Sequence, residues 1–189
     1  MSTPTVRRDW APEAVRIIFG IIWAIDAWLK WQPGFRTTFL PNMITTAGAE
    51  PHWLAPWFAF VLRVLRTAPH VWPYLAAGVE TTLAITLLLG VGRRAVYAGG
   101  AVYGMSIWCT ADGFGAPYGP GATDIGPGII YALVFVSLLV MLERGHGGHL
   151  ALDAVLVRRV PWWSRLAGPV GAGAAPAPAK TVAGVASRP

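Results

Sequence analysis

The chain has 189 residues, a length typical of a single domain, and a formal net charge of +6. It is 54% hydrophobic and 13% charged, with a mean hydropathy of +0.50, which is typical of a membrane protein and not of a nucleic-acid-binding domain. Its single cysteine, Cys109, excludes an internal disulfide and a dithiol redox centre. We interpret it as a small buried residue near a helix end.

Four apolar stretches are long enough to cross a bilayer as helices, because roughly 17–25 such residues span its hydrocarbon core. We expect a cytoplasmic leader at residues 1–12 and then a membrane domain over residues 13–145. The predicted fold is therefore an all-α integral membrane protein, a bundle of four transmembrane helices. The predicted spans are about 13–31, 73–91, 95–111 and 128–142.

The positive residues are unevenly distributed around these spans. If the N-terminus is cytoplasmic, four of the 15 lysines and arginines lie outside: Lys30, Arg36, Arg63 and Arg66. Because positive residues concentrate on the cytoplasmic side, both termini are predicted to be cytoplasmic. We expect a multi-pass protein of the inner (plasma) membrane.

Shorter segments are predicted to lie on the two membrane surfaces. The first span ends at Gln32-Pro33-Gly34, and the outer segment that follows contains one predicted helix, at about 53–66, which is too short to span and lies on the outer leaflet. Residues 146–166 form a basic amphipathic segment on the inner surface. Residues 167–189 are rich in alanine, glycine and proline and are predicted to be disordered.

Ionisable residues inside the predicted spans form a candidate site. On a helix wound at about 100° per residue, Arg16, Asp26 and Lys30 share one face of the first span. Asp26 and Lys30 are four residues apart and can pair, whereas Arg16 lies near the inner boundary and is expected to snorkel. Glu80 lies at a similar depth in the second span, among small residues. We therefore predict a cluster of Asp26, Lys30 and Glu80.

Three roles are open for this cluster. It is a buried polar network that fixes helix register, a proton or ligand site, or a docking surface for another subunit. No metal site is predicted, because the histidine pairs His52/His70 and His146/His149 lack a third ligand in the sequence.

Small residues and a glycine-rich loop shape the second half of the chain. Gly100 and Gly104, four residues apart in the third span, allow close helix packing. Packing within the bundle is the main interpretation, and a homo-oligomer is the alternative. The loop at residues 112–128 is expected to cover the mouth of the bundle, with Asp124 and Pro127 at the start of the last span.

These residues resemble the DoxX-like membrane proteins, and in particular the DoxD-type small subunits of thiosulfate:quinone oxidoreductase. The similarity covers most of residues 12–143. It rests on five motifs: Arg16-x-x-Phe19-Gly20, Asp26-Ala-Trp-Leu-Lys30-Trp-Gln-Pro-Gly-Phe35, Glu80 followed by Leu87-Leu-Leu-Gly90, Gly113-Phe-Gly-Ala-Pro-Tyr118, and Gly121-Ala-Thr-Asp124-Ile-Gly126.

The resemblance implies a membrane subunit that acts with another subunit and passes electrons from thiosulfate to a membrane quinone. The quinone would enter from the bilayer, and Glu80 or Asp26, paired with Lys30, would handle its protons. Ring contacts are expected from Trp108, Phe114 and Tyr118, and attraction of the anionic substrate from Arg36, Arg63 and Arg66. The alternative is a non-catalytic scaffold or assembly subunit of a redox complex.

Overall fold

A computed structural model describes residues 10–115, 124–148 and 150–170. All the helices discussed below lie in these ranges. The all-α prediction is confirmed for them, since they contain eight α-helices and no strand. The α-helices are α1 Ala11–Lys30, α2 Pro33–Ala49, α3 Ala55–Thr67, α4 Trp72–Leu89, α5 Arg93–Thr110, α6 Pro127–Glu143, α7 Asp153–Arg159 and α8 Ser164–Ala167.

Among the described helices, α4 alone is both long and apolar enough to be a candidate membrane span. The helix α6 is apolar but shorter, with 17 residues. Charged residues lower the apolar character of α1, which carries Glu13, Arg16, Asp26 and Lys30, and α5 begins with Arg93 and Arg94. The four predicted spans correspond to α1, α4, α5 and α6, and their insertion in a membrane stays a prediction.

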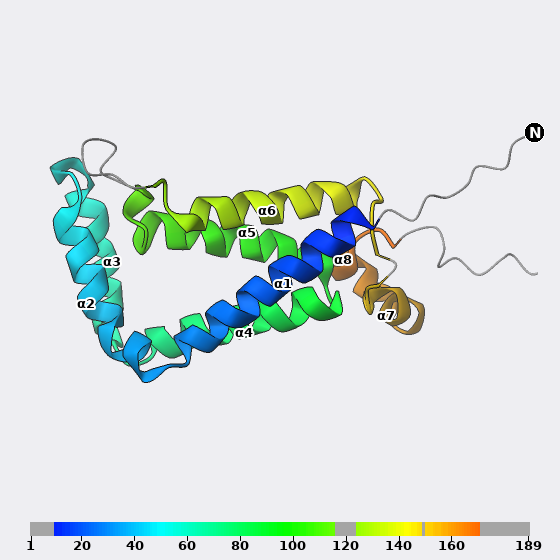
Figure 1. The fold of residues 1–189 in the computed structure, drawn as a ribbon, viewed down its shortest axis with the longest axis horizontal. Helices are drawn as coiled ribbons and strands as arrows, with labels where there is room; N and C mark the ends of the chain where they lie inside the picture. The colour runs from blue at the N-terminus through cyan, green and yellow to red at the C-terminus, as the bar shows by residue number, and fades with distance from the viewer. Residues whose placement is uncertain (1–9, 116–123, 149, 171–189) are drawn as a thin grey trace, which may run out of the picture.

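The four long helices form two antiparallel pairs, α1 with α4 and α5 with α6 (Figure 1). The pairs meet at the end where a tight turn joins α4 to α5. Gly90 and Gly92 have φ values of +65° and +63° in this turn, a conformation that glycine adopts without strain. Away from the turn the pairs diverge, so α4 and α5 are chain neighbours that pack together over only part of their length.

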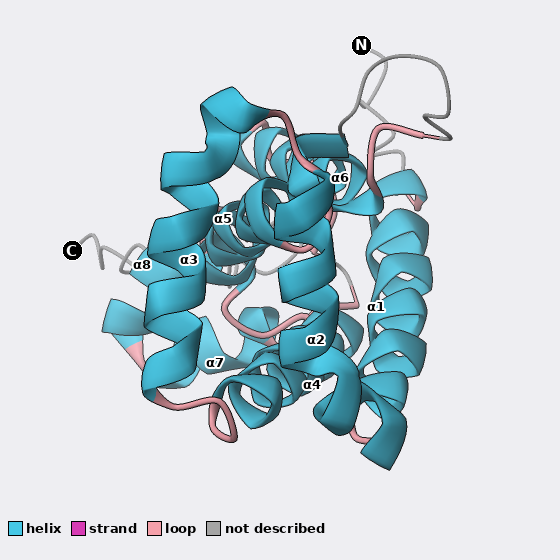
Figure 2. Cartoon of the chain, turned by 90° about the vertical axis from the view of Figure 1, so that its left-hand side faces the viewer, coloured by secondary structure: helices cyan, strands magenta, loops and turns pink. Residues whose placement is uncertain are grey.

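The open end of this arrangement is crossed by α2 and α3, which stand side by side in front of the other helices (Figure 2). The helix α3 confirms the helix predicted at about 53–66. The sequence pattern does not predict α2, because Pro33-Gly34 is typical of a helix end and the helix has no buried residue and no apolar face. Pro33 instead occupies its first turn, where a missing N–H costs nothing.

The core lies between the two pairs, and α5 and α6 approach each other closely along their shared face. A Cβ atom on Gly104 would lie 2.9 Å from the backbone nitrogen of Ala132 and 3.0 Å from the carbonyl oxygen of Gly128. A Cβ atom on Gly100 would overlap the ring of Phe135. Packing within the bundle is thus confirmed for the two glycines. The core residues are Phe19, Trp23, Leu83, Ala84, Leu87, Tyr97, Phe135, Leu138 and Leu142.

We expect Gly104→Ala to lower the free energy of unfolding by about 1–3 kcal/mol, because the added methyl group meets the α6 backbone, which cannot move aside. The matched control is Gly99→Ala in the same helix, since a Cβ atom there has open space around it. This control should change stability by less than about 1 kcal/mol, and toward a more stable helix. Denaturation followed by circular dichroism compares the two, and equal stability of both variants would contradict the close packing.

Candidate functional site

A buried carboxylate, that of Glu80 on α4, lies at the centre of the candidate site. Its side chain is 1% exposed. The Nζ atom of Lys30 lies 3.5 Å from Glu80 Oε2 and 2.9 Å from Asp26 Oδ1. The structure therefore brings together Asp26, Lys30 and Glu80, as the sequence predicts.

The local sequence explains how α1 and α4 come close enough for these contacts. Ala27 on α1 and Ala77 on α4 are both buried, and such small side chains let two helices approach closely. Asp26 and Lys30 are one helical turn apart, so that one ammonium group reaches both carboxylates. The spacing and the small residues together position the cluster.

Tyr103 on α5 is the fourth member of the site, and the sequence analysis did not single it out. Its hydroxyl group donates a hydrogen bond of 3.0 Å to Glu80 Oε1. Its ring also lies 5.9 Å from that of Trp23, which contacts Tyr131 and Phe135. The sequence does not predict this contact, because the side of α5 that faces α4 depends on the angle between the two helix pairs.

A cleft of about 660 Å³ opens between α4 and α5, where the two pairs diverge. Its walls are largely apolar, and Tyr103 forms part of one wall, so the tyrosine links the cleft to buried Glu80. Gly78 and Gly99 also line the cleft, and a Cβ atom on either would meet open space. The remaining lining residues are Tyr74, Leu75, Val79, Thr82, Leu83, Thr86, Ala95, Val96 and Gly100.

Two of the three aromatic residues predicted to contact a ligand ring, Trp108 and Phe114, lie away from the cleft. The rings of Trp108 and Phe114 are 5.3 Å apart, and Trp108 donates a hydrogen bond of 2.8 Å to the Ile125 carbonyl oxygen. Phe114 also contacts Trp57 of α3, and neither Trp108 nor Phe114 lines the cleft. Tyr118 lies outside the described residues. The contacts of Phe114 with Trp57 and Trp108 join α3 to the end of α5.

The three arginines predicted to attract an anion have different surroundings. Arg36 on α2 donates a hydrogen bond of 2.7 Å to the hydroxyl oxygen of Tyr74, a residue that lines the cleft. Arg63 and Arg66 are exposed on α3. Arg36 is thus the only one of the three that the described contacts connect with the cleft.

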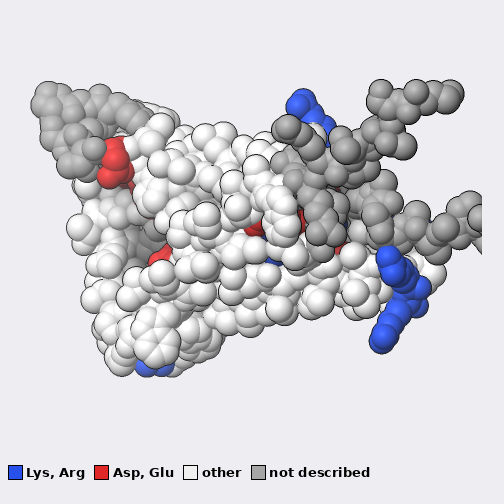
Figure 3. Space-filling model, turned by 45° about the vertical axis from the view of Figure 1, so that its right-hand side comes forward, with Lys and Arg blue, Asp and Glu red and all other residues white. Residues whose placement is uncertain are grey.

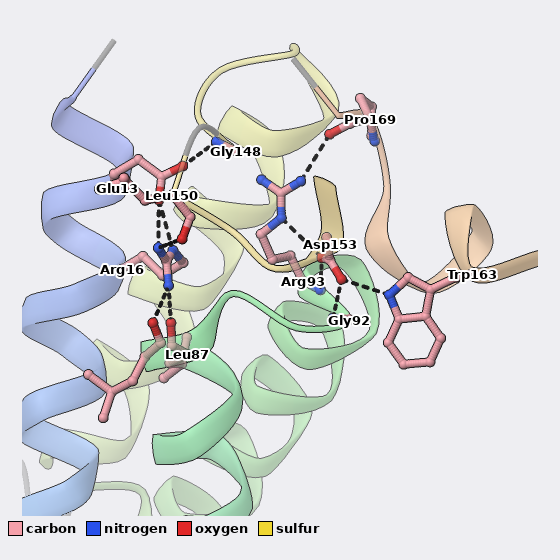
Figure 4. Close-up of polar contacts among 11 residues, drawn as sticks. Glu13, Arg16, Leu87, Gly92, Arg93, Gly148, Leu150, Asp153, Trp163 and Pro169 are labelled. Carbon is pink, nitrogen blue, oxygen red and sulfur yellow. Dashed lines mark hydrogen bonds and ion pairs between the residues drawn. The ribbon is translucent and has the colours of Figure 1, made fainter. Parts of the chain in front are cut away.

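A second buried polar cluster lies at the opposite end of the bundle (Figure 4). Arg16 forms an ion pair of 2.7 Å with Glu13, and both side chains are almost fully buried. Arg16 also donates hydrogen bonds to the carbonyl oxygens of Leu87 and Leu88 in the last turn of α4. The expectation that Arg16 snorkels is wrong, because these carbonyl groups, which lack partners at a helix end, hold it inside.

The rest of this cluster attaches the segment after α6 to the α4–α5 turn. Asp153, which is fully buried, accepts hydrogen bonds from the backbone N–H groups of Gly92 and Arg93 at 2.8 and 3.1 Å. It also accepts from the Arg93 side chain at 3.1 Å and from the Trp163 indole at 2.7 Å. The sequence did not reveal this pair, since Arg93 and Asp153 are 60 residues apart. The cluster thus holds the segment after α6 against the α4–α5 turn.

One carboxylate outside the helices supports the start of α6. Asp112 accepts a hydrogen bond of 2.7 Å from the backbone N–H of Gly128, in the first turn of the helix. Burial raises the pKa of Asp112 from its usual range, the Gly128 N–H opposes this, and the nearby charge of Asp124 adds to it. Asp112 is therefore a helix cap that the fold holds in a partly desolvated place.

Chemically, the site combines a buried acid, a cation and a tyrosine beside an apolar cleft. Among the described residues, no group of three histidine, cysteine, aspartate or glutamate side chains is placed to hold a metal ion. The arrangement can hold and pass a proton at the edge of the cleft. Comparison of the chain with models of protein families, with curated proteins and with solved structures finds no match.

We expect Arg16→Met to lower stability by about 3–5 kcal/mol, because it leaves the carboxylate of Glu13 buried without its partner. The double variant Glu13→Gln/Arg16→Met should lose less, since no buried charge is left. Arg94→Met, in an exposed ion pair with Glu143, should leave stability nearly unchanged. Thermal unfolding compares the variants, and a double variant less stable than Arg16→Met would contradict the ion-pair interpretation.

We expect Asp112 to make stability depend on pH. Its pKa is raised in the folded state, so the fold favours the protonated form. The contribution of Asp112 to the free energy of unfolding is greatest below pH 3.8, the ordinary pKa that it has in the unfolded chain. This contribution is lost as the pH rises through the pKa of the folded state. Asp112→Asn keeps an oxygen acceptor for Gly128 without a charge, and it should remove this loss. Unfolding measured from pH 3 to pH 7 tests it, and parallel pH profiles of the two proteins would contradict it.

Proposed function

We propose that this chain is the membrane subunit of a quinone-linked oxidoreductase, with a quinone bound in the cleft between α4 and α5. One observation carries the proposal: Tyr103, in the wall of an apolar cleft, donates a hydrogen bond to the buried carboxylate of Glu80. An acid in that position can supply protons to a ligand that lies in the cleft. The resemblance to DoxD-type subunits supports the same reaction class.

The distribution of side chains supports insertion in a membrane through α1, α4, α5 and α6. The outward faces of these helices are apolar, with Trp28 on α1 69% exposed and Val102 on α5 71% exposed. The charged side chains of α1 are turned inward, as expected for helices in lipid. Figure 3 shows one face of the molecule, with lysine and arginine gathered toward its ends and a largely uncharged middle. We place the chain in the inner membrane, with both termini cytoplasmic.

The cleft suits a quinone in size and chemistry. Its volume of about 660 Å³ is within the range of small-molecule pockets. Leu75, Val79 and Leu83 offer an apolar wall to a ring and an isoprenoid tail. When Glu80 is protonated and donates to the Tyr103 oxygen, the single hydroxyl proton of Tyr103 is released to a ring oxygen in the cleft. Because the cleft opens between two helices of the proposed membrane domain, a lipid-soluble ligand can enter it from the bilayer.

The proton chemistry follows from the same contacts. Reduction of a quinone to a quinol takes two electrons and two protons. With Glu80 protonated, the 3.0 Å contact reverses and Glu80 donates to the Tyr103 oxygen; Tyr103 then gives its hydroxyl proton to a ring oxygen and takes one from Glu80, and reprotonation of Glu80 allows the second transfer. The electrons come from a partner subunit, with thiosulfate as the proposed donor, which is oxidised to tetrathionate outside.

The direct test is thiosulfate-dependent reduction of a quinone analogue in membranes that contain the chain and its partner. We expect Glu80→Gln and Tyr103→Phe each to lower kcat roughly a hundredfold, the low end of what a positioned proton donor contributes. Glu143→Gln, at the surface, is the matched control. Full activity in folded Glu80→Gln would overturn the proposed role of the site.

Filling the cleft separates binding from proton transfer. Gly99→Phe places a ring in the open space, so it should raise KM for the quinone analogue, whereas Gly99→Ala should not. An unchanged KM in Gly99→Phe would place the quinone elsewhere.

A scaffold subunit without chemistry of its own is the second candidate. It is favoured by the exposed aromatic side chains of Trp53, just before α3, and Phe60, which lies one helical turn from the exposed Arg63. In that case Trp53→Ala/Phe60→Ala should release a partner subunit in mild detergent, while Glu80→Gln keeps full activity.

A further inference from the structure

The two carboxylate oxygens of Glu80 have different surroundings. Oε1 accepts the hydrogen bond from Tyr103, on the side of the cleft. Oε2 has no hydrogen-bond partner within the described part of the chain, although the ammonium group of Lys30 lies 3.5 Å away. One oxygen is thus engaged toward the cleft, and the other is available to a mobile donor on α1.

Lys30 connects that free oxygen with the end of the molecule where α2 and α3 lie. It stands at the last residue of α1, and its ammonium group lies 5.2 Å from the ring centre of Phe35 on α2. The side chains of Lys30 and Asp26 are 22% and 27% exposed, in contrast to Glu80. The Lys30 ammonium group lies 2.9 Å from Asp26 Oδ1 and 3.5 Å from Glu80 Oε2. Because the lysine side chain is flexible, a small movement moves its hydrogen bond from Asp26 to Glu80.

Toward the opposite end, the site is closed. Along α4, Leu87 lies seven residues beyond Glu80, a rise of about 10 Å. Phe19, Leu83, Leu87 and Phe135 are buried in this interval, and none of these side chains can carry a proton. The ionisable residue buried here is Tyr97, which interacts with Arg16 and Arg93 and lies six residues, about 9 Å, from Tyr103 along α5. Beyond them, Arg16 is held by Glu13 and by the carbonyl oxygens of α4.

The other ionisable groups near the site are two tyrosines and Asp112, which follows α5 and whose charge acts on Lys30. Tyr103 comes from α5 and leads to the cleft. Tyr131 comes from α6, where its ring lies 5.4 Å from that of Trp23. Neither tyrosine leads to the end at which α7 and α8 lie, so we take the partly exposed pair Lys30 and Asp26 as the route by which a proton reaches Glu80 from water.

We propose that Glu80 exchanges its proton only with the side of the membrane on which α2 and α3 lie, through Lys30 and Asp26. Lys30 donates a proton from its ammonium group to Glu80 Oε2 and recovers one from Asp26, which takes it up from water. The sum is one proton moved from that compartment to Glu80, and no electron changes hands. The proposal rests on the proposed function for the membrane setting, and it makes the protons of quinone chemistry come from one side.

The experiment reads the protonation of Glu80 directly, without quinone. Full-length protein is reconstituted in liposomes, which are sorted by an affinity tag at the carboxyl terminus into the two orientations. Dicyclohexylcarbodiimide, a lipid-soluble reagent for protonated carboxyl groups, is added, and modification of Glu80 is quantified by mass spectrometry. The pH is then changed in one compartment at a time. We expect the rate of modification to follow the pH on the α2–α3 side and to ignore the pH on the other.

Variants test the route itself. Lys30→Met should slow the response to a pH jump by at least about tenfold, a modest part of what a positioned proton-transfer group contributes. Lys30→Arg keeps the cation but does not release its proton, so it should be slowed as well. Arg94→Gln, at the closed end, should respond like the unchanged protein. A response to the pH on the α7–α8 side, no modification of Glu80 at any pH, or an unslowed Lys30→Met would each overturn the proposal.

The same readout separates this proposal from the proposed function. If modification follows the α2–α3 side but no quinone is reduced, the proton route stands and the oxidoreductase assignment fails. If quinone is reduced but modification follows the other side, the assignment stands and the route fails.

Discussion

The rest of the structure depends on the burial of one carboxylate. Glu80 lies where α1, α4 and α5 meet, and a buried acid is stable there only with partners. The acid belongs to α4, and its partners come from α1 and α5. Lys30 on α1 neutralises the negative charge of Glu80, and Tyr103 on α5 donates a hydrogen bond to one of its oxygens. A polar contact thus joins three helices within an otherwise apolar interior.

The charged side chains at the two ends of the bundle differ in burial and in the number of their hydrogen-bond partners. At the closed end, Glu13, Arg16, Arg93 and Asp153 are almost fully buried and have several backbone partners, so they form a rigid network (Figure 4). In the Glu80 cluster, near the end crossed by α2 and α3, Lys30 is shared by two carboxylates and partly exposed. A fully satisfied network fixes geometry, whereas one with a spare acceptor leaves room for a proton to move.

Much of this follows from periodicity. The helical spacing of Asp26 and Lys30 and the depth of Glu80 predict the cluster, and the paired glycines predict the α5–α6 contact. Tyr103 and the cleft could not be predicted, because a tight turn between α4 and α5 suggests packing along their whole length and does not reveal that they diverge. Asp153 could not be predicted either, since its partners come from a distant turn, and α2 lacks the apolar stripe by which helices are recognised in a sequence.

The pairing of the helices also has a consequence for biosynthesis. The pair α5 and α6 forms between consecutive long helices, but α1 must wait for α4, whose last residue follows Lys30 by 59 positions. At about 5–20 residues per second, a ribosome needs several seconds for that stretch. During this interval Asp26 can pair with Lys30, four residues away, and Arg16 with Glu13, three residues away. The nascent first helix thus carries its own counter-ions until its permanent neighbour has been made.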